Sequence, residues 1–549
     1  MRSPTDDSRP PTGGADAASL SSGSGNSVRD RAAGIAAVGS AAALATGVFL
    51  PYVGAAIGCL TLAIAAAVAY GSAVRELARR SRALGAAPDV VCFVVLSLRL
   101  EPALERATRF AGDHATGRLA DSLAAHAREA RGRSGAGFDA FAATWADAFP
   151  ALRRAAALAD AAVDAPEGDR ERLLDRTLDV VVEGARERTS EYADAVHGPT
   201  MAVYAFGVVL PLALVGVVPA AASAGLPLTV GAFALVYGVV LPLAVLAAVC
   251  WVLARRPVAF PPTSIPSDHP ELDGRERNAV LAAAVGLAAA VGAVATPLLP
   301  PWAFPVVAVG WPVGGALAFW CLPACRVRER ARDVESGLAD ALPVLGHRLR
   351  QGEAVESGVA DAGDSLDGET GAVFAAAARR MRRLGVGVHE SFLGEHGPLA
   401  DAPSARARAV VPLVVHAADA GPAGGRVLVD VAGLFDDLGE LDRAVRREFA
   451  ATTRTLRHTG LVYAPLIAGV TVALAARLTG LDGATALPTA PLALAVGGYV
   501  LWLAAVLPAL AVGLDRGLDR TLVGYHAGVA LVAAATVYPL TATFAGRVL

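Results

Sequence analysis

The chain has 549 residues, of which 54% are hydrophobic and 18% are charged, and its formal net charge is −3. This near-neutral balance excludes an extended basic surface for a nucleic-acid partner. Because all 48 basic residues are arginine, the chain also lacks chemistry that needs lysine, such as a Walker phosphate loop, a Schiff base or a Ser–Lys dyad.

Uncharged apolar stretches recur along the chain. The mean hydropathy of +0.48 is well above that of a soluble protein of this size. Several stretches are about 20 residues long, the length that an α-helix needs to cross a bilayer, and we expect about nine of them to do so. The sequence therefore predicts an all-α, polytopic membrane protein.

Arginines mark one end of each apolar pair. They flank the first hairpin at Arg29 and Arg75 and follow later pairs at Arg255 and Arg326. The positive-inside rule places the amino terminus and two polar regions in the cytoplasm of a multi-pass plasma-membrane protein, with the carboxyl terminus outside. The expected divisions are a disordered tail (1–28), a transmembrane hairpin (29–74), a first cytoplasmic helical bundle (75–198), a transmembrane pair (199–256), a cytoplasmic linker (257–277), a second hairpin (278–325), a second bundle (326–458) and three final transmembrane helices (459–549).

The second polar region contains two amphipathic runs separated by a glycine. Apolar residues at helical spacing run from Leu338 to Leu349, Gly352 interrupts them, and a second run starts at Val355. Pro343 is expected to begin the first helix, because its missing N–H would have no partner in a first turn anyway. The stretch predicts a short helix, a glycine-bearing turn and a second helix.

The two polar regions resemble each other in sequence. Pro88 opens the first as Pro343 opens the second, and Ala111-Gly112-Asp113 then matches Ala362-Gly363-Asp364. Each region ends in arginine-rich helices that run into a proline-containing span. Duplication of a unit made of a helical bundle and a membrane pair accounts for this order.

No catalytic, cofactor-binding or metal site is predicted, and the chain is not expected to be an enzyme. It contains no His-Glu-x-x-His helix, no paired Cys-x-x-Cys and no glycine-rich phosphate loop followed by lysine. Five cysteines, an odd number, argue against a disulfide framework. The predicted spans carry almost no ionisable group except His526, which we interpret as interfacial, and such spans count against a pump or secondary transporter.

Two charged stretches are candidates for partner binding. Arg379, Arg380, Arg382 and Arg383 form a dense basic cluster on a predicted helix. A protein contact and a solvated or lipid-facing surface are equally open for this cluster. The acidic stretch 436–442, which arginines follow, is better explained by ion pairs that stabilise a helix.

The order of a proline-bearing helix, a leucine-rich helix and a glycine before a small-residue-rich helix resembles the secretion-system F domain. The residues that carry this resemblance are Pro88, Leu100, Pro343, Leu349 and Gly352. In the first region Glu101-Pro102 stands in the glycine position, so that copy is the degenerate one. The F domain is found in platform proteins of type II secretion, type IV pilus and archaellum assembly systems, and the many spans are similar to the long archaeal members.

The resemblance implies a non-enzymatic platform without a cofactor. Such a platform docks a hexameric secretion ATPase on its cytoplasmic side and assembles pilin-like subunits drawn from the lipid bilayer, and the resemblance leaves monomer and homo-oligomer open. The alternative is a membrane transporter or channel with large cytoplasmic domains, which only the number of spans favours. An enzyme is a distant third interpretation.

Overall fold

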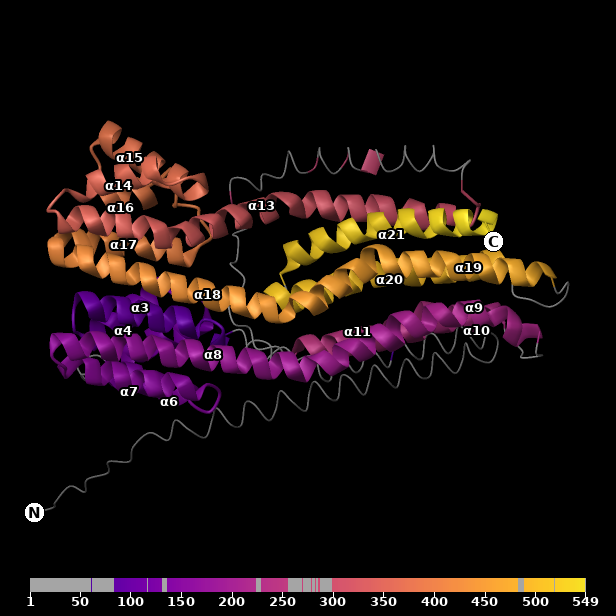
Figure 1. The fold of residues 1–549 in the computed structure, drawn as a ribbon, viewed down its shortest axis with the longest axis horizontal. Coiled ribbons are helices and arrows are strands. Elements are labelled where there is room, and N and C mark those ends of the chain that lie inside the picture. The colour runs from indigo at the N-terminus through magenta and orange to yellow at the C-terminus, as the bar shows by residue number, and fades with distance from the viewer. Residues whose placement is uncertain are drawn as a thin grey trace, which may run out of the picture.

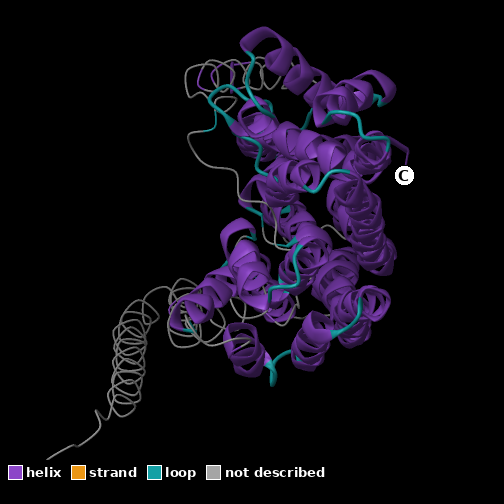
Figure 2. Cartoon of the chain, turned by 90° about the vertical axis from the view of Figure 1, so that its left-hand side faces the viewer, coloured by secondary structure: helices purple, strands orange, loops and turns teal. Residues whose placement is uncertain are grey.

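A computed structural model describes residues 83–115, 117–130, 136–223, 229–254, 299–481, 488–517 and 519–548, with a few isolated positions elsewhere. Every element in these ranges is a helix (Figure 2). The molecule is elongated, with short helices gathered at one end and long apolar helices running side by side at the other (Figure 1). Helices α8 (Glu167–Tyr204), α13 (Ala303–Arg350) and α18 (Pro422–His458) begin or end among the short helices and run toward the apolar end.

The first helical unit is the run from α3 to α9. Each helix from α3 to α8 packs against the next, and α3 also packs against α8, which closes the unit. Proline lies in the first turn of α3 at Pro88 and in the first turn of α7 at Pro150, where its missing N–H costs nothing. Besides α8, the unit comprises α3 (Ala87–Leu100), α4 (Leu104–His114), α5 (Arg118–Glu129), α6 (Ala136–Trp145), α7 (Pro150–Asp164) and α9 (Leu210–Ser223).

The second helical unit starts in the second half of α13 and ends with α19. Its helices pack in the same sequential order, and α13 packs against α18 as α3 packs against α8. The remaining members are α14 (Val355–Ser365), α15 (Gly368–Leu384), α16 (Val388–Leu393), α17 (Ala405–Asp419) and α19 (Ala464–Leu481). Two further long helices, α20 (Thr489–Arg516) and α21 (Arg520–Val548), complete the chain.

Three pairs of corresponding helices in the two units have equal or nearly equal lengths. Helices α4 and α14 both have 11 residues, α7 and α17 both have 15, and α8 and α18 have 38 and 37. The contact between the second and third helix also matches, because Gly112 lies against Ala124 and Gly363 lies against Ala375. In both units the glycine lies twelve residues before the alanine that it contacts. The matched triplets in the sequence therefore occupy the same place in each unit.

The predicted helix start at Pro343 is wrong, because α13 continues through this proline. Pro343 removes the hydrogen bond to the Ala339 carbonyl, a loss of about 3 kcal/mol in an isolated helix. On the same stretch Leu342 and Leu345 are at most 1% exposed. Burial of each such side chain contributes about 1.5–3 kcal/mol, so packing against the unit outweighs the lost hydrogen bond.

The turn that follows differs between the units. Gly352 has φ +79°, a conformation that disfavours any residue with a side chain, and α14 begins three residues later at Val355. After α3 the chain instead leaves the helix in an extended conformation at Glu101, with φ −143°. Any residue adopts that conformation, so Pro102 is tolerated where the second unit needs glycine.

In the part of the chain that the structure describes, three of the long helices contain a π turn just before a proline. The π turns are η1 (Ala205–Val209), η2 (Val236–Val240) and η4 (Thr459–Tyr463), and they join α8 to α9, α10 (Val230–Leu235) to α11 (Leu241–Ala254), and α18 to α19. The prolines Pro211, Pro242 and Pro465 lie two residues beyond each π turn. The wider turn accommodates the proline ring, which would clash with the carbonyl four residues earlier.

Six helices in the described residues are long and apolar enough to cross a membrane, and they correspond to six of the nine expected spans. This length and composition indicate a multi-pass membrane protein. The expected spans in 29–74 and 279–298 and the expected tail lie outside the described residues, isolated positions aside. Within their most apolar window, 67% of α20 but only 17% of the α10–α11 helix is buried, so α20 lies at the centre of the apolar region.

The two helical units contact each other through α3 and α8 against α17 and α18, and through α9 against α19. Arg99 near the end of α3 pairs with Asp175 of its own unit and, at 3.4 Å, with Asp430 of the other. Further along, Tyr192 of α8 packs against Phe449 of α18 with ring centroids 5.9 Å apart. The arginine side chain is 8% exposed, so this contact lies within the interface between the units.

Candidate functional site

A cavity of about 1210 Å³ lies where the helical units meet the apolar helices. Helices α13 and α18 form two of its walls, and the start of α17 with the preceding loop forms a third. Asp89 of α3 contributes from the first unit, so both units line the cavity. The end of α20 and the start of α21 close it toward the apolar region, through Arg516, Tyr525 and His526.

Charge is distributed unevenly along the cavity. Helix α13 runs away from the apolar region and α18 runs back toward it, so residue number gives the depth of each side chain. The far end carries Asp89, Glu335, Asp340, Asp401 and Asp436 with Arg406 and Arg408. The span end, next to the apolar helices, carries Arg332, Arg443, Arg446 and Arg516 with Glu329, Asp333, Asp442 and Asp515. Carboxylates outnumber arginines at the far end, and the two are equal in number at the span end.

An ionic network joins the two units at the far end. Arg406 of α17 donates to Asp89 of α3 from Nε at 2.7 Å and from Nη2 at 2.6 Å. The Ser404 hydroxyl donates to Glu335 of α13, and it also caps α17 by accepting from the Ala407 N–H at 3.0 Å. Burial opposes the charged form of Arg406, but Asp89 and Glu335 raise its pKa above the ordinary value. Burial raises the pKa of Glu335.

Arg332 at the span end lies between other arginines. It is partly buried, and burial together with the charges of Arg516 and Arg446 lowers its pKa to about 10, so it is still protonated at neutral pH. Both neighbours already have carboxylate partners. Arg446 pairs with Asp442 at 2.6 Å, and Arg516 pairs with Asp515 at 3.4 Å. Arg332 is charged and has no ion pair among the described residues.

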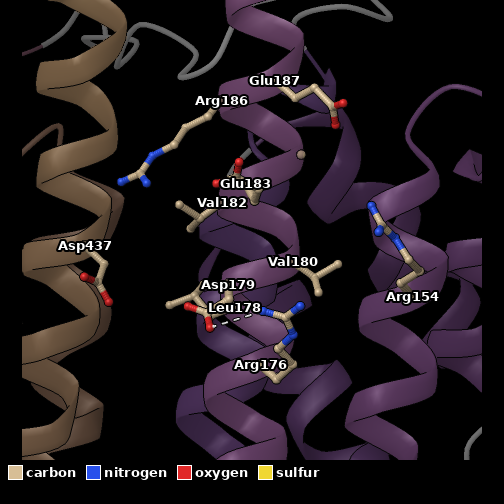
Figure 3. Close-up of a pocket in the computed structure, with 11 residues that line it drawn as sticks. Arg154, Arg176, Leu178, Asp179, Val180, Val182, Glu183, Arg186, Glu187 and Asp437 are labelled. Atoms are coloured by element: carbon tan, nitrogen blue, oxygen red, sulfur yellow. Dashed lines mark ion pairs between the residues drawn. The ribbon is translucent and has the colours of Figure 1, made fainter.

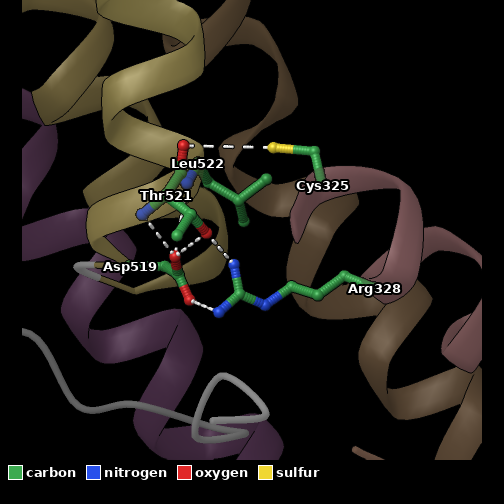
Figure 4. Close-up of polar contacts among 5 residues, drawn as sticks. All are labelled: Cys325, Arg328, Asp519, Thr521 and Leu522. Atoms are coloured by element: carbon green, nitrogen blue, oxygen red, sulfur yellow. Dashed lines mark hydrogen bonds and ion pairs between the residues drawn. The ribbon is translucent and has the colours of Figure 1, made fainter. Parts of the chain in front are cut away.

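A buried ion pair fixes α13 to the start of α21 beside the cavity (Figure 4). Arg328 pairs with Asp519, and the two side chains are 5% and 6% exposed. Asp519 also accepts from the Thr521 N–H at 2.8 Å and from the Thr521 hydroxyl at 2.7 Å, and Arg328 donates to that hydroxyl. Burial opposes the carboxylate, but the hydrogen bond from Thr521 and the charge of Arg328 lower the pKa of Asp519.

A second pocket, of about 390 Å³, lies between α7, α8 and α18 (Figure 3). Its charges alternate in sign, and Arg176 approaches Asp179 to 3.9 Å. Arg186 extends from α8 toward α18, which carries Asp437 (Figure 3). Burial and the neighbouring Asp179 raise the pKa of Asp437. Four carboxylates and three arginines line this open groove, so its charges largely balance and select no ligand.

The predicted arginine cluster lies on α15, away from both pockets. Arg379, Arg382 and Arg383 are exposed. Arg380 instead donates to the carbonyls of Glu395 at 3.0 Å and His396 at 3.1 Å, so it holds the loop after α16. Only three of the four arginines are therefore available to a partner.

The motif residues hold the units together and line no cavity. Pro88 and Leu100 lie in the first turn and at the last residue of α3, and Leu349 is 4% exposed near the end of α13. Pro343 lies inside α13, and Gly352 forms the turn after it. Their positions explain packing and turn geometry, and none contacts a candidate site.

Sequence reasoning missed the cavity and its charges. In the sequence, Arg328 and Arg332 served only as part of the arginine-rich segment that indicates the orientation in the membrane. Their spacing of one helical turn places both on one face of α13. Asp519 directly before an apolar helix is a recognisable N-cap signal. His526 does lie near the start of α21, but it lines the polar cavity.

Comparison with protein-family models, with curated proteins and with solved structures found no match. The described residues contain no group of three or more His, Cys, Asp or Glu side chains that could hold a metal ion. The sequence patterns and the geometry of this chain are therefore the basis for a functional proposal.

Proposed function

We propose that the chain is the membrane platform of a type IV pilus-like or type II secretion-like machine. In this role it couples a cytoplasmic hexameric secretion ATPase to the assembly of pilin-like subunits from the bilayer. The helical units face the cytoplasm of a plasma membrane, and the layout is that of a long archaeal platform with a duplicated F domain. The platform acts as a monomer or a homo-oligomer.

The observation that carries the proposal is the continuity between each helical unit and an apolar span. Helix α8 runs through η1 into α9 as one 53-residue helix, and α18 runs through η4 into α19 as one of 57 residues. A displacement of either unit therefore reaches the apolar region along an unbroken backbone. A machine that converts motion outside the membrane into motion within it needs such a connection.

The arginine positions support the proposed orientation. Arg326, Arg328 and Arg332 follow the apolar part of α13, and Arg457 precedes η4, so basic residues lie on the same side as both units. Basic residues next to spans favour the cytoplasmic side. The exposed Arg379, Arg382 and Arg383 lie on α15, one of the short helices gathered at the end of the molecule away from the apolar helices, where a soluble ATPase has access (Figure 1).

A pull-down of secretion-type ATPases by the full chain in detergent tests the proposal. The triple variant Arg379→Ala, Arg382→Ala, Arg383→Ala is expected to lose retention of the ATPase. The matched control Arg109→Ala, Arg153→Ala, Arg172→Ala removes three exposed arginines from the first unit and is expected to retain it. Retention by both variants would move the docking surface elsewhere, and no retention by the unchanged chain would overturn the platform proposal.

The alternative function is a membrane transporter or channel with large cytoplasmic domains. The cavity of about 1210 Å³ favours it, because this polar space reaches the ends of α20 and α21. Ion or solute flux through the purified chain in liposomes distinguishes the two functions. Flux without ATPase retention would favour transport.

A further inference from the structure

Three arginines gather at the span end of the cavity, close enough for the charges of Arg446 and Arg516 to act on Arg332. Arg332 lies in the wall of α13, Arg446 in that of α18 and Arg516 at the end of α20, so three separate helices bring arginines to one place. Gathering like charges costs free energy unless an opposite charge offsets it. Asp442 and Asp515 offset the charges of Arg446 and Arg516, with which they pair. No such pair offsets the charge of Arg332 among the described residues.

Unused donors remain at this place. Each guanidinium has five N–H donors, and one carboxylate engages at most two of them well. Arg332 has no ion pair among the described residues. Nε of Arg516 lies 3.4 Å from Asp515 and is buried there without a well-aligned hydrogen bond. Asp515 is further shared with Arg457, whose Nη2 lies 3.2 Å from it. The donors of Arg332 and Arg516 therefore outnumber the protein acceptors that reach them.

The site lies at the depth of the membrane surface. The apolar part of α13 ends at Ala324, two helical turns before Arg332. On the opposite side, Tyr525 and His526 occupy the second turn of α21, whose remainder is apolar. The phosphates of a bilayer lie where apolar helix segments give way to polar ones, so a headgroup reaches this place without leaving its leaflet.

We propose that Arg332, Arg446 and Arg516 form a binding site for a phosphate-bearing anion at the span end of the cavity. A phosphate group offers several acceptor oxygens in the geometry that planar guanidinium groups match. Its source is either the headgroup of an anionic lipid or a free phosphate compound from solution. The carboxylates at the far end of the cavity repel the anion, which confines it to the arginines. The site is independent of the proposed platform function.

The test uses the full chain, stripped of lipid in a neutral detergent, and follows thermal unfolding. The probes are short-chain phosphatidylglycerol, short-chain phosphatidylcholine and inorganic phosphate, each at constant ionic strength. Saturable stabilisation by phosphatidylglycerol alone identifies a lipid headgroup, and stabilisation by inorganic phosphate as well identifies the phosphate group itself as sufficient. Equal stabilisation by phosphatidylcholine, or none by any probe, would overturn the proposal.

The variant Arg332→Gln and its control Arg326→Gln localise the site. Arg326 is an exposed arginine on the same helix, six residues earlier and outside the cavity. Arg332→Gln is expected to weaken the apparent affinity at least about tenfold, as loss of one charge-assisted hydrogen-bonding group does. Arg326→Gln is expected to bind as the unchanged chain does. Equal losses in both variants would show general surface electrostatics and contradict the proposal.

A reversal of stability separates binding from a structural role. Without a probe, Arg332→Gln removes a charge that burial and neighbouring arginines disfavour, so its unfolding temperature is expected to equal or exceed that of the unchanged chain. At saturating probe the order is expected to reverse. A variant that is less stable by the same amount with and without probe would assign Arg332 a packing role only. If Arg332→Gln does not fold, Arg332→Lys keeps the charge and is expected to retain weaker, measurable binding.

Discussion

The first and second helical units share their internal packing but differ in their surroundings. Within each unit the helix order, the long helix (α8 or α18) and the Gly–Ala contact are the same. Beyond the units, α20 and α21 pack against α19 of the second unit, while the first unit is followed by the weakly buried α10–α11 helix. Contacts that hold a unit together thus persist when contacts with the membrane helices differ.

The difference also shows which sequence features a unit needs. The second unit turns through Gly352 with φ +79°, whereas the first passes Glu101 in an extended conformation. The first unit is therefore not a damaged copy at this position. It reaches the same helix packing by another backbone path. Four experiments test how far this equivalence extends.

The largest effect is expected at the buried Arg328–Asp519 ion pair, which joins α13 of the second unit to the start of α21. Arg328→Met leaves the buried Asp519 carboxylate without its partner, and such a loss costs about 3–5 kcal/mol of stability. Thermal unfolding of the purified chain measures it. The exposed Arg326→Met serves as the control and is expected to stay within about 0.5 kcal/mol of the unchanged chain. Equal shifts of the unfolding temperature in both variants would show that the Arg328–Asp519 pair does not stabilise the fold.

The Gly–Ala contacts provide a matched test inside the units. A Cβ on Gly363 would lie 2.6 Å from the backbone nitrogen of Ala375, so Gly363→Ala is expected to cost about 1–3 kcal/mol. A Cβ on Gly112 would lie 3.1 Å from Ala124, and the gain of about 1 kcal/mol in helix propensity largely offsets that strain. Chemical unfolding of both variants should therefore rank Gly363→Ala as the more damaging. A larger loss of stability in Gly112→Ala than in Gly363→Ala would contradict the closer helix approach at Gly363.

A smaller effect is expected where α20 contacts the first unit. The Tyr499 hydroxyl donates to the Gly207 carbonyl, which lies four residues before Pro211 and so lacks its normal helical donor. Tyr499→Phe is expected to cost about 0.5–1.5 kcal/mol. The exposed Tyr463→Phe is the control, and unfolding temperatures compare the two. No difference between them would mean that another donor reaches Gly207.

The smallest effect is a pH dependence at the network between the units. Burial raises the pKa of Glu335 in the folded chain, so the folded chain binds more protons than the unfolded chain between the unfolded value, about 4.3, and the raised value. The stability contributed by Glu335 therefore falls as pH rises through that window. Relative to Glu335→Gln, the unchanged chain is expected to lose unfolding temperature as pH rises. A relative gain would contradict this sign.

Periodicity and apolar length predicted much of the fold. Uncharged stretches located the six spans now described, because crossing a bilayer requires length and apolarity that any sequence shows directly. Pro150 does begin α7 and Pro166 directly precedes α8, because a helix start needs no N–H from these positions. Pro343 failed as a boundary because the buried faces at Leu342 and Leu345 belong to one continuous helix. Local propensity carries no information on that packing.

The candidate site was much less predictable. Its arginines come from α13, α18 and α20, which are up to 184 residues apart between Arg332 and Arg516. Only the fold brings them together. The one candidate cluster visible in sequence, on α15, is also reduced by the fold, since Arg380 is used by carbonyls of a loop. Residue spacing shows which side chains share one face of a helix. It does not show which side chains of other helices lie beside that face.

The helix formed by α18, η4 and α19 has a mechanical consequence. Its 57 residues form a rod about 85 Å long at 1.5 Å per residue. Such a rod resists compression and passes torque along its axis, whereas a jointed connection would dissipate both. The η4 turn, with its wider spacing and the proline beyond it, is the most compliant point of the rod. A push or twist at the tip of the second unit would therefore arrive in the apolar region as axial thrust and rotation, and the rod would yield first at Thr459–Tyr463.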